Sequence, residues 1–194
     1  MFTQMMLTAL LAVTAENLLF AGGAGLSGAL RAARNPGSVG WTSCFVAFFS
    51  LCAALAGIRM EPYLAPRPDA WLVRPAALLA AAAAAYLLLA VPLRLFAPRF
   101  FRRHAREIGP AAANTAVLAV PCAQRLFGFG AAQAAGYAAG TGAAFWFASA
   151  VLARAPRACR NPDAPAPFAG LPAALIYIGI LSMAFAGFTG AKVF

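Results

Sequence analysis

Charged residues are scarce in this chain, and acidic residues are the scarcest. Of 194 residues, 10% are charged, only five are Asp or Glu, and one is His. An ordinary soluble domain has about 25% charged residues. The sequence also has no glycine-rich phosphate loop, no HExxH and no nucleophile elbow. These absences exclude an ordinary soluble domain and argue against catalytic machinery carried by this chain alone.

Cysteine and histidine are also too few to suggest a site. Four cysteines occur without CxxC spacing, at Cys44, Cys52, Cys122 and Cys159. Two of them fall in an apolar run, where a buried thiol usually acts as a small hydrophobe, so no disulfide is predicted. The lone His104 lies in "PRFFRRHAREIGP", a basic and aromatic gap between apolar runs. We expect it to be a solvated loop residue at the headgroup boundary rather than a metal ligand.

Long hydrophobic runs, in contrast, fill the chain, which is 63% hydrophobic. Crossing a bilayer of about 30 Å takes roughly 17 to 25 apolar residues. Six runs meet or approach this length: 5–27, 39–58, 71–93, 109–124, 130–152 and 168–190. The sequence therefore predicts an all-α integral membrane protein, a single domain of six spans over residues 1–194.

The formal charge of +10 comes from basic residues in the gaps between these runs. Nucleic-acid binding would favour one basic face or tail instead, so we read the charges as topology determinants. Ten of the 15 Lys and Arg residues fall in gaps on one side of a six-span chain. The positive-inside rule then places both termini outside the cytoplasm. The first run has no basic residue before it and is too long for a signal peptide, so we expect it to be retained.

Six spans divide into halves of about 1–93 and 94–194, and an odd number of crossings per half makes any repeat inverted. The first and fourth spans then correspond, and both contain helix-breaking residues. The first has four glycines at Gly22, Gly23, Gly25 and Gly28, and the fourth lies between Pro110 and Pro121. We expect interrupted spans made of half-helices. Close helix packing by small residues is the alternative, and it is the favoured interpretation for three glycines of the fifth span.

Glu16 is the only acidic residue within any predicted span. A charge at that depth costs at least about 2.5 kcal/mol unless it is compensated, so Glu16 either functions or braces the local structure. Asn17 and Asn114 occupy comparable places in the two broken spans, where an amide can satisfy both a freed N–H and a freed C=O. The predicted central broken-helix site comprises Glu16, Asn17, Gly22, Gly23, Gly25 and Asn114.

Three segments are similar to a known family: "ENLLFAGGAGLSG", "NTAVLAV" and the ending at 164–194. They resemble the Rnf/Nqr membrane subunits, and the ending is most like the A subunit of the Rnf electron-transport complex. The D and E subunits of the sodium-translocating NADH:quinone reductase are also similar. The resemblance implies a membrane subunit of an electron-transport complex that couples to Na⁺ or H⁺ translocation in a bacterial inner membrane. It also implies a homologous partner subunit of opposite topology.

The resemblance fails at one chemical feature. In the family each broken span supplies one cysteine, and two subunits together hold an intramembrane [2Fe–2S] cluster. The matching positions here are Ser27 and Thr115, and hydroxyls are poor substitutes for thiolates on iron. We therefore expect no cofactor ligated by this chain. A stand-alone inverted-repeat transporter or channel for a cation or polar solute is the alternative function, and a structural scaffold is a third.

Overall fold

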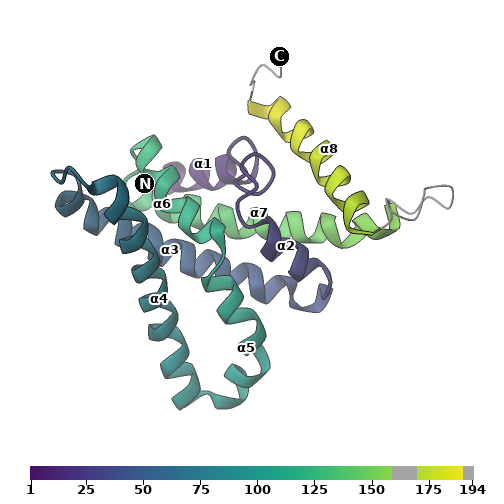
Figure 1. Ribbon diagram of the computed structural model, residues 1–194, viewed down its shortest axis with the longest axis horizontal. Helices are drawn as coiled ribbons and strands as arrows, with labels where there is room; N and C mark the ends of the chain where they lie inside the picture. The colour runs from purple at the N-terminus through teal and green to yellow at the C-terminus, as the bar shows by residue number, and fades with distance from the viewer. Residues whose placement is uncertain (159–169, 190–194) are drawn as a thin grey trace.

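The computed structural model describes residues 1–158 and 170–189, which form eight α-helices, one short 3-10 helix and no β-strand (Figure 1). In chain order the elements are α1 Phe2–Val13, α2 Leu26–Ala33, η1 Pro36–Ser38, α3 Val39–Leu64, α4 Ala70–Phe96, α5 Pro98–Ala112, α6 Thr115–Phe127, α7 Ala131–Ala158 and α8 Leu171–Thr189. The prediction of an all-helical chain is confirmed for these residues.

Two helices, α3 and α4, are long and apolar enough to cross a membrane by length and composition, among the residues that the structure describes. They match the predicted spans 39–58 and 71–93; α3 extends beyond the C-terminal end of its predicted span, and α4 extends beyond both ends. Shorter apolar helices occur at Phe2–Val13, Thr115–Phe127 and Pro172–Gly187. The number of crossings, six, stays a prediction.

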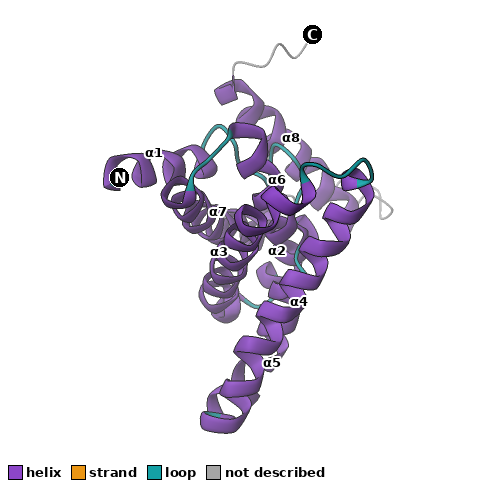
Figure 2. Cartoon of the chain, turned by 90° about the vertical axis from the view of Figure 1, so that its left-hand side faces the viewer, coloured by secondary structure: helices purple, strands orange, loops and turns teal. Residues whose placement is uncertain are grey.

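The centre of the molecule is the pair α3 and α7. Helix α7 packs against α1, α2 and α3, whereas α3 also packs against α4, α5 and α6. Helices α4 and α5 pack against each other as an arm that extends away from this centre (Figures 1 and 2). Three fully buried aromatic rings, Phe49, Tyr137 and Phe145, fill the space around the central pair.

Small residues allow the close approach of α7 to its neighbours. A Cβ at Gly136 or Gly140 would collide with the backbone of α1, and one at Gly142 would collide with α3. Thr8 of α1 adds a hydrogen bond, because its hydroxyl donates to the backbone oxygen of Gln133 at 2.9 Å. The packing interpretation of these glycines is therefore confirmed.

The segment around His104 differs from the prediction, because it is a helix and not a loop. Pro98 occupies the first turn of α5, where the missing N–H of proline costs nothing. Phe100, His104 and Ile108 then recur at intervals of four residues and share one face. This face turns inward: the rings of His104 and Trp41 lie 4.7 Å apart, and Ile108 is fully buried.

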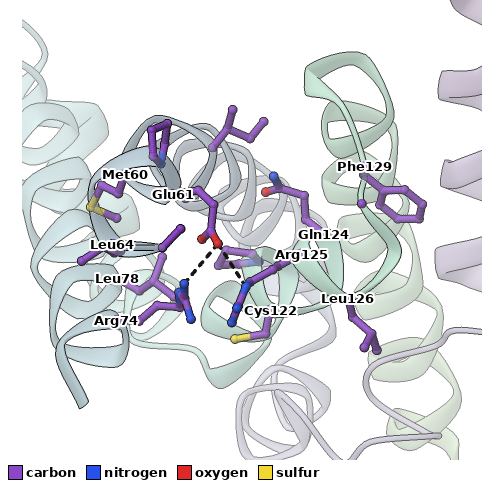
Figure 3. A pocket seen from close by; sticks show the side chains of 16 residues that line it. Met60, Glu61, Leu64, Arg74, Leu78, Cys122, Gln124, Arg125, Leu126 and Phe129 are labelled. Carbon is purple, nitrogen blue, oxygen red and sulfur yellow. Dashed lines mark hydrogen bonds and ion pairs between the residues drawn. The ribbon is translucent and has the colours of Figure 1, made fainter. Parts of the chain in front are cut away.

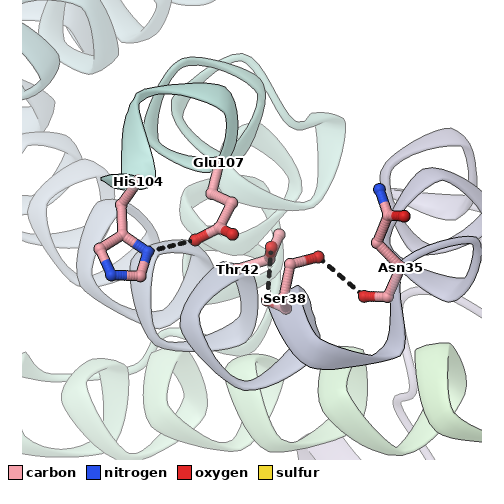
Figure 4. Close-up of polar contacts among 5 residues, drawn as sticks. All are labelled: Asn35, Ser38, Thr42, His104 and Glu107. Carbon is pink, nitrogen blue, oxygen red and sulfur yellow. Dashed lines mark hydrogen bonds and ion pairs between the residues drawn. The ribbon is translucent and has the colours of Figure 1, made fainter. Parts of the chain in front are cut away.

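His104 is therefore buried, and the expectation of a solvated residue is wrong. Its Nδ1 forms a 2.7 Å hydrogen bond with Oε2 of Glu107, one turn further along α5 (Figure 4). The nearby start of α3 has its own local bonds, since the Thr42 hydroxyl donates to the backbone oxygen of Ser38. Short-range polar contacts therefore stabilise this end of the bundle.

Candidate functional site

The first predicted span is interrupted after Val13, and Asn17 satisfies the groups that the interruption frees. Its Nδ2 donates to the backbone oxygen of Val13 at 3.0 Å, while its Oδ1 accepts from the backbone N–H groups of Leu19 at 3.1 Å and Phe20 at 3.3 Å. Asn17 is fully buried. Because water does not reach this buried side chain, its hydrogen bonds replace the missing helical ones.

Two other helices hold the interrupted segment in place. Tyr137 of α7 donates its hydroxyl to the backbone oxygen of Glu16 at 3.3 Å. Ser182 of α8 donates to the backbone oxygen of Phe20 at 2.5 Å, and the rings of Phe20 and Phe185 stack with centroids 4.8 Å apart. The break is therefore a fixed feature of the fold, with side-chain partners on both sides.

The fourth predicted span is interrupted at Asn114, between α5 and α6. Asn114 has an extended backbone conformation and caps α6, because its Oδ1 accepts from the backbone N–H of Ala116 at 3.0 Å. Such a cap satisfies one of the N–H groups that a helix start leaves free. Both predicted breaks are present, and each has a buried asparagine.

The two breaks meet in space although they lie far apart in sequence. The backbone N–H of Gly25, which is the cap residue of α2, donates to Oγ1 of Thr115, the first residue of α6, at 2.7 Å. We call this contact, together with Asn114 and Gly28 beside it, the half-helix joint. It brings the N-termini of two helices to one place, where their dipoles create a positive potential.

Two glycines make room for Asn114 within the half-helix joint. A Cβ at Gly25 would lie 2.8 Å from Asn114 Oδ1, and one at Gly28 would lie 2.6 Å from Asn114 Nδ2. Gly25 also has a φ of +85°, which is easily adopted only by glycine. Asn114 Nδ2 is buried and has no hydrogen-bond partner among the described residues.

The structure does not bring every predicted site residue into the joint. The Glu16 carboxylate is partly exposed, and it forms no hydrogen bond or ion pair within residues 1–158 and 170–189. Gly22 and Gly23 are exposed, and Gly23 has no atom within 4 Å of where its Cβ would be. The joint therefore contains Gly25, Asn114 and Thr115, while the rest of the predicted site surrounds the break in the first span.

The residues at the joint do not fit an iron–sulfur cluster. Ser27 and Thr115, at the two positions where the resemblance implies cysteines, are both exposed. The Thr115 hydroxyl already accepts the Gly25 N–H. No group of three or more His, Cys, Asp or Glu residues gathers in the described part of the chain. Three cysteines are free, and Cys159 lies outside the described residues.

Sequence reasoning missed a second polar site, formed by Glu61, Arg74 and Arg125. Because α3 continues to Leu64, Glu61 lies inside a long apolar helix, beyond the predicted end of that span at residue 58. Arg74 falls inside the predicted span 71–93, which was a signal that could have revealed this site. The contact with Arg125 has no local sequence signal, because that residue comes from α6.

Comparison with known proteins assigns the chain to a family. No protein-family model matches it. Two curated relatives, from two strains of Cereibacter sphaeroides, are each described as the A subunit of an ion-translocating oxidoreductase complex. Both are 31% identical to this chain over 143 residues, which is 74% of this chain and 74% of each relative. The chain belongs to the family of these A subunits. The resemblance to Rnf A-type membrane subunits is thereby confirmed, and with its apolar helices this family member is a multi-pass membrane protein.

Proposed function

We propose that this chain is a membrane subunit of an Rnf-type ion-translocating oxidoreductase complex, coupled to Na⁺ or H⁺ translocation. The observation that carries the proposal is the identity to two A-type relatives over 143 residues. The half-helix joint supports it, since interrupted membrane helices are tolerated where they are buried in protein or line a functional site. The chain contributes architecture to the complex, and its partners supply the redox chemistry.

The proposed membrane arrangement has six crossings in an inverted repeat. Helices α1 and α2 together form the first crossing, and α5 and α6 together form the fourth. Helices α3, α4, α7 and α8 each form one crossing. Support comes from reciprocal packing: α7 lies against the broken pair of the first half, and α3 lies against the broken pair of the second half. An inverted repeat places the two breaks near the midplane at the repeat interface, where the half-helix joint would lie.

We also propose that this subunit gives no ligand to a [2Fe–2S] cluster. Thr115 uses its hydroxyl to tie α6 to α2 instead, so the family architecture would persist without the metal. Ser27 and Thr115 remain exposed at the starts of α2 and α6. That face is the proposed contact with a homologous partner of opposite topology.

Co-purification tests the proposal. The chain is given an affinity tag in its native host, solubilised in mild detergent and isolated with whatever remains attached. We expect further membrane subunits of an ion-translocating oxidoreductase complex in fixed stoichiometry. A stable homo-oligomer without any redox partner contradicts the proposal.

One observation favours the alternative of a stand-alone transporter for a cation or polar solute: the Glu16 carboxylate has no partner among the described residues. The purified chain is reconstituted alone into liposomes and assayed for Na⁺ and H⁺ flux. A flux that Glu16→Gln abolishes would favour the transporter. Asp69→Asn is the matched control, because Asp69 is exposed and makes no side-chain cap at the start of α4. The complex-subunit proposal expects no flux from the chain alone.

A further inference from the structure

A cavity of about 870 Å³ opens where three helix ends meet. It lies between the C-terminal end of α3, the first turns of α4 and the C-terminal end of α6 (Figure 3). The cavity is separate from the half-helix joint, and none of the joint residues lines it. What it binds does not depend on the function proposed above.

The cavity contains an excess of positive charge. Oε1 of Glu61 lies 3.1 Å from Arg74 Nη2 and 3.1 Å from Arg125 Nε, so one carboxylate serves two guanidinium groups. Figure 3 shows both arginines converging on this single oxygen. Arginine forks hold carboxylate and phosphate through paired N–H donors. One carboxylate leaves most of those donors free for a second anion.

Two residues that line the cavity each have a buried polar atom without a partner among the described residues: Arg74 Nε, a donor, and Gln124 Oε1, an acceptor. The Arg74 side chain is 15% exposed, and Gln124 is 8% exposed. A buried polar atom without a partner is uncommon in a native protein and often marks the place of a missing water or ligand. A ligand that satisfies both residues needs an oxyanion, which accepts from Arg74, and a hydroxyl group, which donates to Gln124.

The rest of the cavity wall is apolar and lies at the level expected for the membrane surface. Met60, Leu78 and Phe129 line it beside the arginines. The connection from α3 to α4 follows directly, and on either side of it Tyr63 and Trp71 are 78% and 75% exposed. Tyrosine and tryptophan concentrate at membrane–water interfaces, where one end of the ring is apolar and the other is hydrated. An amphiphile at this depth could place its head in the cavity and its chains along the exposed face of α4.

We propose that this cavity binds the anionic head of a glycerophospholipid. Its phosphate oxygens accept hydrogen bonds from Arg74 and Arg125, and a headgroup hydroxyl donates to Gln124. The cavity is thus a lipid site that recognises phosphate and hydroxyl together.

Native mass spectrometry of the full-length chain in detergent tests this site. The probes are dioleoylphosphatidylglycerol, which has both groups, dioleoylphosphatidic acid, which lacks the hydroxyls, and zwitterionic dioleoylphosphatidylcholine. We expect phosphatidylglycerol to bind about tenfold more tightly than phosphatidylcholine. Phosphatidylcholine has the same phosphate, but it lacks the headgroup hydroxyls and places a cationic ammonium near the two arginines. Phosphatidic acid should fall between them.

Three variants separate this site from general attraction of acidic lipid. Arg125→Gln should lower the affinity for phosphatidylglycerol about tenfold; the Arg125 side chain is 56% exposed, so the fold should tolerate it. Glu61→Gln should raise the affinity, because it removes the competing carboxylate. Arg59→Gln is the control, since this exposed arginine on the same end of α3 does not line the cavity.

The outcomes are distinct. Equal binding of phosphatidylglycerol and phosphatidylcholine, or equal losses in Arg125→Gln and Arg59→Gln, overturns the proposal. A loss of affinity in Glu61→Gln also counts against it, because the proposal requires the Glu61 carboxylate to compete with the lipid phosphate for the two arginines. If millimolar inorganic phosphate displaces the lipid in an Arg125-dependent way, the oxyanion site stands but its ligand is free phosphate rather than lipid.

Discussion

Asn17 and Asn114 are both buried at helix breaks, but they bond differently. Asn17 forms three hydrogen bonds with the freed backbone groups of its own segment. Asn114 caps α6 with its oxygen, while its Nδ2 is buried without a partner in the described chain. Asn17 is therefore the residue on which the first break depends, whereas Asn114 retains an unused donor within the half-helix joint.

Replacing Asn17 should destabilise the protein strongly. Asn17→Ala leaves one carbonyl and two N–H groups buried without partners, and each orphaned group costs about 1–3 kcal/mol. We expect a loss of about 2–4 kcal/mol in the free energy of unfolding, allowing for partial relaxation. Denaturation in mixed detergent and SDS micelles measures it. The control Asn35→Ala is at an exposed position and should change stability by less than about 0.5 kcal/mol.

Gly28 should tolerate no side chain, because Asn114 occupies the space beside it. In Gly28→Ala the new Cβ would lie 2.6 Å from Asn114 Nδ2, and such overpacking costs about 1–3 kcal/mol. Gly179→Ala is the matched change in α8, where no atom lies within 4 Å of the new Cβ, and it should be neutral or slightly stabilising. The same unfolding assay compares the two. Equal effects would contradict the close approach at the joint.

At the scale of elements, the long contact between α1 and α7 depends on two glycines. A large side chain at Gly140 would have to displace the backbone of α1. Gly140→Leu should therefore detach α1 and make it accessible to protease in detergent, with a loss of stability of more than about 3 kcal/mol. Gly187→Leu, on the open side of α8, should leave proteolysis of α1 unchanged. Protection of α1 in Gly140→Leu would show that this packing is not close.

The elements also show how far sequence reasoning reaches. The glycines of the first span and the Asn114 region indicated the two breaks correctly, because local chemistry determines where a helix ends. Helix α5 was missed because its arginines were read only as topology determinants, although the spacing of Phe100, His104 and Ile108 is helical. The hydrogen bond from Gly25 to Thr115 spans 90 residues, and no local pattern could reveal it.

At the scale of the whole molecule, the distribution of basic residues predicts an orientation in the membrane that can be tested. Ten of the 15 Lys and Arg residues fall in alternate gaps, which predicts both termini outside the cytoplasm. Alkaline phosphatase fused within 65–69, between α3 and α4, should be active, and a fusion at Ala97 should be inactive. Green fluorescent protein at the same two positions should give the opposite pattern. Activity of the phosphatase at Ala97 would invert the proposed topology.

The central claim for the whole molecule is that this A-type protein keeps the family architecture without ligating a cluster. Iron and acid-labile sulfide in the tagged, purified assembly, with its EPR spectrum, test that claim most directly when wild type is compared with the Ser27→Ala, Thr115→Ala double variant. The account predicts the same iron, sulfide and spectrum in both assemblies. A stoichiometric [2Fe–2S] signal that is present in wild type and lost in the double variant would contradict it.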